Sequence, residues 1–221
     1  MAFPQKSSRS AFTLVELLVV LGVMALFVGV FATALRPGSP TVAVEGAQSQ
    51  LASLLTQARG VAVLKNASTR LIIHNDSAGD DDRYLRFAGI VYAVDTSVPA
   101  DGKIDEWWPA TDGITLPQGV YARIDDWGNM ETGFNLEYIS DTTEEYAYIE
   151  FYTNGTVANV SGGPIGSPIL AVSTGEPNPN ATGGFDDPTF NDDNVRGAIV
   201  RRYGSFVLLN EPNAFPTEVR P

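Results

Sequence analysis

Residues 11–20 read Ala11-Phe12-Thr13-Leu14-Val15-Glu16-Leu17-Leu18-Val19-Val20 and open an apolar run that continues to Leu35. From Leu17 to Leu35 there are nineteen residues without a charge. At about 1.5 Å of rise per residue, such a stretch forms roughly 28 Å of helix, which is close to the ~30 Å apolar core of a bilayer. The run therefore predicts a membrane-length helix near the start of the chain.

Glu16 is the only charged residue between Ala11 and Leu35. A carboxylate inside an apolar membrane segment is costly, needs a partner and is a functional candidate by default. Lys6 and Arg9 lie upstream of the run and Arg36 lies at its far end, so the segment itself offers no cation. The partner of Glu16 has to be sought outside this helix.

The segment from Arg9 to Val20 resembles the start of type IV prepilin-like proteins. In that family a short basic leader and a small residue, usually Gly, precede Phe-Thr-Leu-x-Glu and a long apolar helix. The resemblance implies that a prepilin peptidase cuts between Ala11 and Phe12 and methylates the new amino terminus of Phe12. It also implies that Glu16 meets the amino terminus of a neighbouring subunit, which would supply the missing cation from another chain.

Two other interpretations of the N-terminus stay open. Lys6 and Arg9 could form the basic region of an ordinary secretory signal peptide, with Ala32-Thr33-Ala34 as an A-x-A-like site cut after Ala34. The apolar run is long for the roughly 7–15 residues of such a peptide, and a plain membrane anchor is the third alternative. In the anchored cases, the positive charges on the short side predict a cytoplasmic N-terminus and a C-terminal domain in the periplasm or outside the cell.

Composition limits the partners of the chain. It has 221 residues, a formal net charge of −12 and no cysteine. Residues beyond the apolar run suffice for one domain with its own core. An acidic surface disfavours nucleic acid and anionic lipid headgroups, so we expect no nucleic-acid partner. Without cysteine no disulfide can close a loop, and stability must come from packing or from a bound metal ion.

A second helix follows the first. The segment 36–40 contains two prolines and a glycine and should end the apolar helix. Apolar residues then recur at three- and four-residue steps from Val44 to Ala62, with Ser39 or Thr41 as a cap and Asn66 as a stop. The predicted segments are a leader at 1–11, a transmembrane and assembly helix at 12–36, an amphipathic helix at 41–66 and an extracytoplasmic β-rich domain at 67–221.

The remaining chain has the patterns of strands and turns. The predicted strands are 69–74, 84–94, 119–124, 146–152, 198–203 and 206–209. Asn154-Gly155 and Gly204-Ser205 predict hairpin turns, 95–114 and 161–188 are predicted loops, and 211–216 is predicted to be a poorly ordered tail. We expect an α+β fold of the pilin kind, with the second helix packed on one mostly antiparallel sheet of six or more strands.

The β-rich part carries a second resemblance. Leu51–Ala62 followed by Lys65-Asn66, the strand entry Ile114–Val120 and the turn Ile149–Gly155 resemble the H-type minor pseudopilin of type II secretion and related minor pilins. The resemblance implies a minor subunit.

Acidic loops suggest one metal site. Asp101-Gly102-Lys103-Ile104-Asp105-Glu106 resembles the middle of an EF-hand-like calcium loop, with Asp101, Asp105 and Glu106 as candidate ligands. Ser97 and Trp108 would occupy the first and twelfth positions of that loop, where carboxylates are needed. Solvated acidic loops are therefore the favoured interpretation, and calcium is the alternative.

No catalytic or cofactor-binding residue is predicted. His74 is the sole histidine and ends a predicted strand, so we expect a structural role. With no cysteine and no second histidine, the chain cannot build a Cys–His nucleophile or a histidine-based zinc site. Trp107, Trp108 and Trp127 could form an aromatic binding surface, although such residues more often fill a core.

Two functions compete. The leading prediction is a non-enzymatic structural subunit of a type IV pilus or a type II secretion pseudopilus, whose partners are prepilin peptidase, other pilin or pseudopilin subunits, the bacterial inner membrane and the assembly platform. The rival is a secreted or membrane-anchored β-rich binding module, for instance for carbohydrate, released by an ordinary signal peptidase. The identity of the mature N-terminal residue separates the two.

Overall fold

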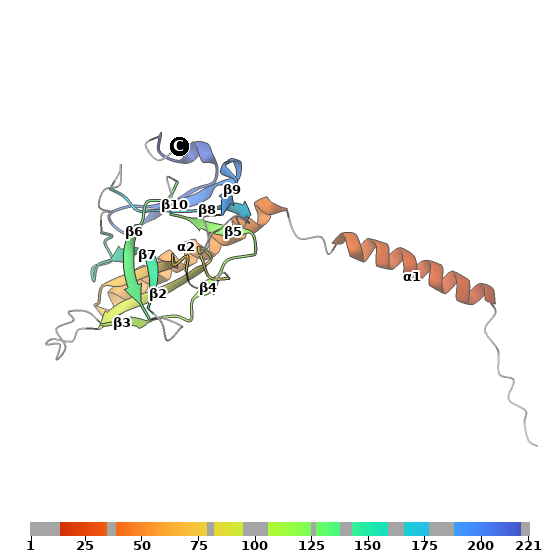
Figure 1. Cartoon of the computed structure of the whole chain (residues 1–221), viewed down its shortest axis with the longest axis horizontal. Coiled ribbons are helices and arrows are strands. Elements are labelled where there is room, and N and C mark those ends of the chain that lie inside the picture. The colour runs from red at the N-terminus through yellow and green to blue at the C-terminus, as the bar shows by residue number, and fades with distance from the viewer. Residues whose placement is uncertain are drawn as a thin grey trace, which may run out of the picture. The chain divides into compact units, whose positions relative to one another are not determined.

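A computed structural model of the chain describes residues 14–34, 39–78, 82–94, 106–124, 127–137, 143–158, 166–176 and 188–217. The chain divides into two units, Met1–Gly38 and Ser39–Pro221, and we treat each by itself (Figure 1). We call the second one the globular unit. The predicted leader and Phe12 lie outside the described residues.

The described part of the first unit is a single helix, α1 (Leu14–Ala34). Glu16 lies in its first turn, and the last turn has no basic residue. Side chains are described from Leu14 to Phe27, and all of them are exposed. Within the part of the chain whose side chains the structure describes, no helix is long and apolar enough to cross a membrane.

Helix α2 (Pro40–Lys65) opens the globular unit. Pro40 is tolerated at the first helical position because that backbone N–H has no intrahelical acceptor. Ser39 occupies the N-cap position, but its side chain makes no capping hydrogen bond. Asn66 ends the helix in the left-handed conformation, with φ 49°, and its backbone N–H donates to the carbonyl of Ala62. The buried residues of α2 are Val44, Ala47, Gln48, Leu51, Leu54, Leu55, Ala58 and Ala62.

One sheet, which we call sheet A, has six strands in the order β3-β2-β1-β7-β6, with β4 paired to β2. Its strands are β1 (Thr69–His74), β2 (Phe87–Val94), β3 (Glu106–Pro109), β4 (Ile114–Thr115), β6 (Glu131–Leu136) and β7 (Glu144–Phe151). The central strand β1 pairs antiparallel with both neighbours, so that Thr69 lies opposite Tyr92 on β2 and Phe151 on β7.

The other sheet, sheet B, has five strands in the order β11-β10-β8-β5, with β9 paired to β8. Its strands are β5 (Val120–Arg123), β8 (Ile169–Glu176), β9 (Thr189–Phe190), β10 (Arg196–Val200) and β11 (Phe206–Leu209). Two short 3-10 helices, η1 (Asp192–Asn194) and η2 (Pro212–Ala214), flank β10 and β11. All the strand pairs that the structure describes are antiparallel.

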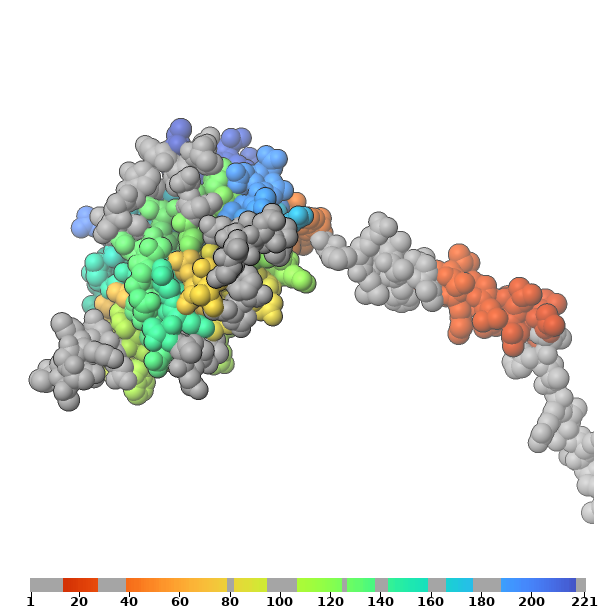
Figure 2. Space-filling view, in the orientation of Figure 1, coloured from red at the N-terminus to blue at the C-terminus, as the bar shows by residue number. Residues whose placement is uncertain are grey.

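Helix α2 contacts strands of both sheets and lies at the centre of the main core. Leu51, Leu55 and Ala58 of the helix share this core with Leu71 and Ile90 of sheet A. Sheet B adds residues from β5, β8 and β10 to the same cluster. In the space-filling view, segments from early and late in the chain lie together on one face of the globular unit (Figure 2). The predicted α+β class, with a helix packed on antiparallel β-structure, is confirmed.

The prediction of one sheet is wrong, because the strands divide between two. The predicted loop 161–188 contains β8, which lies between β10 and β5 in sheet B. β8 is buried from Ile169 to Ser173, so its short apolar stretch is the signature of a strand covered on both sides. The predicted loop 95–114 likewise contains β3, and β6 is a further strand that the pattern did not predict.

Of two further local predictions, one fails and one is confirmed. Residues 211–216 are not a loose tail, because η2 folds back and Phe215 is 1% exposed. The hairpin turn predicted at Asn154-Gly155 does form, because the Gly155 N–H donates to the carbonyl of Tyr152 and Val157 returns to bridge Phe151 antiparallel. Val157 also donates its N–H to the carbonyl of Arg202, which joins this turn to the β10–β11 hairpin.

Candidate functional site

The candidate assembly segment is described only in part. Ala11 and Phe12, the predicted cleavage and methylation residues, lie outside the described residues. Glu16 lies in the first turn of α1, where a carboxylate favours helix formation because it faces the positive end of the helix dipole. Its side chain is exposed, as are the apolar side chains around it. Glu16 is therefore accessible to another chain.

The candidate calcium ligands are not brought together by described atoms. Asp101 and Asp105 lie outside the described residues, and Glu106 begins β3 with a side chain that is not described. Among the residues that the structure does describe, no group of three or more His, Asp or Glu side chains could hold a metal ion. A calcium site at 101–106 stays a prediction.

His74 belongs to a buried polar network on sheet A. Its Nε2 lies 3.5 Å from Glu144 Oε2, and its ring meets Tyr146 edge-on at 5.4 Å. Arg83 Nη1 lies 2.9 Å from the same carboxylate oxygen. The Tyr146 hydroxyl donates to Glu144 at 2.9 Å and accepts from Arg83 Nη2 at 2.9 Å. The network satisfies a buried carboxylate, so the arrangement supports the predicted structural role of His74.

The pKa of Tyr146 gives this network a pH dependence. Burial, reinforced by the hydrogen bond to Glu144, raises the pKa of the Tyr146 hydroxyl well above its ordinary range. In the unfolded chain the tyrosine hydroxyl ionises near pH 10. The stability that the buried, neutral Tyr146 hydroxyl contributes is therefore complete below about pH 10, and it is lost as the pH rises through the higher pKa of the folded state.

The first prediction concerns alkaline stability. The urea midpoint of the wild type should fall more steeply than that of Tyr146→Phe between about pH 9 and pH 11, because phenylalanine has no proton to lose. Tyr152→Phe serves as control, because Tyr152 is 46% exposed and should leave the wild-type slope unchanged. Equal slopes for wild type and Tyr146→Phe would contradict the assignment.

The three tryptophans do not form one binding surface. Trp127 is 5% exposed and meets Phe215 edge-on at 5.2 Å in the core of sheet B. Trp107 and Trp108 are neighbours on β3, so their side chains point to opposite faces of sheet A. Only Trp108 is widely exposed, at 49%.

Arg70 packs on the face of the Trp107 ring that could otherwise have bound a ligand. Its guanidinium lies 4.2 Å from the ring centre of Trp107, 4.1 Å from that of Tyr148 and 4.5 Å from that of Phe134. Arg70 also binds Glu150 at 2.9 Å. This stack of a cation on three aromatic rings covers one face of Trp107, so that face is not available to a sugar ring.

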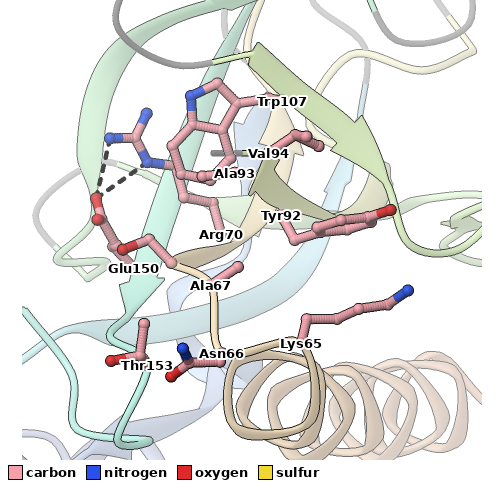
Figure 3. A pocket seen from close by; sticks show the side chains of 11 residues that line it. Lys65, Asn66, Ala67, Arg70, Tyr92, Ala93, Val94, Trp107, Glu150 and Thr153 are labelled. Atoms are coloured by element: carbon pink, nitrogen blue, oxygen red, sulfur yellow. Dashed lines mark hydrogen bonds and ion pairs between the residues drawn. The ribbon is translucent and has the colours of Figure 1, made fainter. Parts of the chain in front are cut away.

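A pocket of about 430 Å³ opens beside this stack, where α2 ends and β1 begins. Figure 3 shows the Arg70 guanidinium directed toward Glu150, while Lys65 and Tyr92 stand together across the opening. Lys65 Nζ lies 5.0 Å from the centre of the Tyr92 ring. The volume is within the range of small-ligand sites. Arg70 and Glu150 neutralise each other on its wall, whereas Lys65 adds a positive charge. The sequence patterns gave no indication of this pocket.

Comparison with known proteins identifies the N-terminus. Residues 6–32 match the prokaryotic N-terminal methylation motif. No curated protein matches the chain. Among solved structures, the type IV minor pilin FimU of Pseudomonas aeruginosa is similar, with 17% identity and a TM-score of 0.40 over 82% of this chain and 98% of that one.

The methylation motif includes the leader residues Lys6 and Arg9, the predicted cleavage site after Ala11, and Glu16. These are the residues that carry the resemblance in the sequence. The match confirms the resemblance of this N-terminal segment to the start of type IV prepilin-like proteins.

Proposed function

We propose that the chain is a non-enzymatic structural subunit, of the minor kind, in a type IV pilus or in the pseudopilus of type II secretion. The observation that carries the proposal is the match to the methylation motif over residues 6–32, a range that includes Ala11, Phe12 and Glu16. The motif links cleavage, methylation and an acidic position in one short segment, a combination that a signal peptide or a plain anchor does not need. The H-type pseudopilin resemblance of Leu51–Ala62 favours a minor subunit.

The proposed steps of membrane insertion, processing and assembly follow from the N-terminal sequence. It enters the inner membrane through the uncharged run Leu17–Leu35, with Lys6 and Arg9 holding the N-terminus in the cytoplasm. Prepilin peptidase cuts after Ala11 and methylates Phe12. On the assembly platform, Glu16 then pairs with the Phe12 amine of a neighbouring subunit, and the globular unit stays outside the cytoplasm. The charge of Glu16 is thereby neutralised in an apolar surrounding.

Mass spectrometry of the mature N-terminus tests the processing step. We expect N-methyl-Phe12 as the first residue. Leu35 as the first residue would support the secreted binding module released by an ordinary signal peptidase. Retention of Met1 or Ala2 would support a plain membrane anchor, and either of these outcomes would overturn the proposal.

Glu16→Gln and Glu16→Ala test assembly. Both variants should insert and be cut like the wild type, yet enter filaments far less, because removal of one charge from a buried pair leaves the partner amine uncompensated. Asp112→Asn is the matched control, since Asp112 is an exposed acid of the globular unit that forms no ion pair among the described residues. Immunoblots of sheared filaments against whole-cell protein give the ratio, and normal incorporation of the Glu16 variants would refute this role.

A further inference from the structure

The basic side chains that the structure describes in the globular unit fall into two groups. Five of them bind carboxylates, in the pairs Arg70–Glu150, Arg83–Glu144, Arg86–Asp82, Arg123–Asp192 and Arg196–Glu45. Four others, Arg59, Lys65, Arg201 and Arg202, form no ion pair within the described part of the chain. In a protein with 26 acids and 14 bases, these four exposed cations are available for contacts with another molecule.

The four cations gather at the C-terminal end of α2. A Cβ at Gly155 would lie 3.2 Å from Arg59 Nε, and one at Gly204 would lie 2.9 Å from the same atom. The two glycine turns therefore pack against Arg59. Arg202 is held in the same place, because its carbonyl accepts the N–H of Val157 at 2.9 Å. Lys65 lies about 1.7 turns of helix after Arg59, on the rim of the pocket in Figure 3.

Two exposed tyrosines stand among these cations. Tyr152 and Tyr203 precede the two glycine turns and are 46% and 75% exposed. We call Arg59, Lys65, Tyr152, Arg201, Arg202 and Tyr203 the basic end of the globular unit. Tyrosine and arginine are the residue types that contribute most to protein interfaces, because they combine a large contact area with hydrogen-bonding groups.

The opposite end of the globular unit carries the opposite charge. Arg196, the first residue of β10, binds Glu45 near the start of α2 at 2.9 Å. The turn that follows β10 packs on Arg59, further along α2, so β10 and α2 run in the same direction. The antiparallel registers of β8 and β11 with β10 place Glu176 and Glu211 beyond that start. Asp193 belongs to η1, which precedes β10 and contacts β8 and η2. We call these three exposed acids the acidic end; none of them forms an ion pair among the described residues.

The separation of the two ends favours contact between molecules over contact within one. From Glu45 to Arg59 the helix rises by about 21 Å at 1.5 Å per residue, which exceeds the Debye length of about 8 Å at physiological salt. Charges that far apart do not neutralise each other within one unit. They are complementary, however, when the basic end of one unit meets the acidic end of another.

We propose that the basic end of one globular unit docks on the acidic end of a second copy of this chain. The net charge of −12 repels a nucleic acid, whereas the acids that match the basic end are present on the protein itself. Because the two surfaces differ, the contact is heterologous, so it joins copies head to tail instead of forming a two-fold dimer. Its role in a filament rests on the proposed function, but the contact itself does not depend on cleavage at Ala11.

Disulfide trapping tests the contact directly, because the chain has no cysteine of its own. The full chain in detergent receives Tyr203→Cys in the basic end and Asp193→Cys in the acidic end. Under mild oxidation at low salt, the double variant should give a ladder of covalent multimers. An equal mixture of the two single variants should give dimers only, and each single variant alone should stay monomeric.

Charge reversal supplies the second arm. Arg201→Glu combined with Arg202→Glu should reduce the cross-linked dimer at least tenfold, and a partner with Glu176→Lys and Glu211→Lys should restore it. Asp112→Lys is the matched control, because Asp112 is an exposed acid on the β3–β4 connection of sheet A. Raising the salt should weaken the wild-type contact, since exposed charges are screened.

Three results would overturn the inference. They are the absence of cross-links in the double variant, dimers formed by either single variant alone, and binding of duplex DNA by the basic end in place of the second copy. None of these outcomes touches the mature N-terminus. A chain that starts at N-methyl-Phe12 but does not cross-link refutes the contact alone, whereas a chain that starts at Leu35 refutes the proposed function alone.

Discussion

Phe215→Ala should destabilise the globular unit by about 3–5 kcal/mol, the usual cost of removing a buried phenylalanine. Phe215 is 1% exposed and meets Trp127 edge-on at 5.2 Å, with the ring planes at 89°. It also lies over Gly197, where a Cβ would come within 3.1 Å of Phe215 Cζ. The ring thus fills a space that the glycine leaves open, and alanine would leave a cavity there.

Urea unfolding followed by circular dichroism measures this effect. Leu208→Ala is the control, since Leu208 lies only a few residues earlier but is 44% exposed and should cost less than about 1 kcal/mol. Similar unfolding midpoints for Phe215→Ala and Leu208→Ala would mean that the C-terminal turn does not pack as described.

Arg83→Met should cost a similar amount, about 3–5 kcal/mol, because it leaves the Glu144 carboxylate buried without its cation. Glu144 has 6% of its side chain exposed and Arg83 has 12%, so water screens the pair poorly. The Tyr146 hydroxyl would remain as a donor to Glu144, but a hydroxyl does not replace a guanidinium that bonds both carboxylate oxygens.

The double variant Arg83→Met with Glu144→Leu should recover much of that loss. Replacement of a buried ion pair by apolar residues of similar size is often close to neutral, whereas removal of one member is not. A double-mutant cycle on the unfolding free energies gives the coupling between the two residues. A double variant as unstable as Arg83→Met alone would show that the cost arises from lost packing of the arginine and not from the uncompensated charge.

Helix α2 and several strands were predictable because their sequence patterns are local. The three- and four-residue spacing from Val44 to Ala62 reappears as the buried face of α2, and Thr69–His74 is a strand with the predicted bounds. Asn66 was predictable as a helix end because asparagine tolerates the left-handed conformation found there.

The division into two sheets was not predictable from such patterns. No local sequence pattern indicates that Ile169–Val172 pairs with β10 and β5. A short apolar stretch among glycines and prolines has the composition of a loop. Phe215 was missed for a related reason. One aromatic residue between prolines predicts a tail, and only its partners Trp127 and Gly197, far away in sequence, show that it is core.

The candidate site divides in the same way. Glu16 could be identified from sequence because its significance lies in the distance along the chain from Ala11 and Phe12. The basic end could not, since Arg59 and Arg202 become neighbours only through the packing of Gly155 and Gly204 against the helix.

The side chain of Gln48 has a consequence for how the protein reaches this structure. Buried in α2, its amide nitrogen donates to the carbonyl of Gly197 at 2.7 Å and to that of Leu209 at 3.0 Å, residues 149 and 161 positions later in the chain. Contacts over such distances are formed late and slowly, because long loops must close first. Sheet B therefore cannot cover the apolar face of α2 until almost the entire polypeptide has been synthesised. During that interval the nascent protein is at its greatest risk of aggregation, and a holding chaperone would have most to protect.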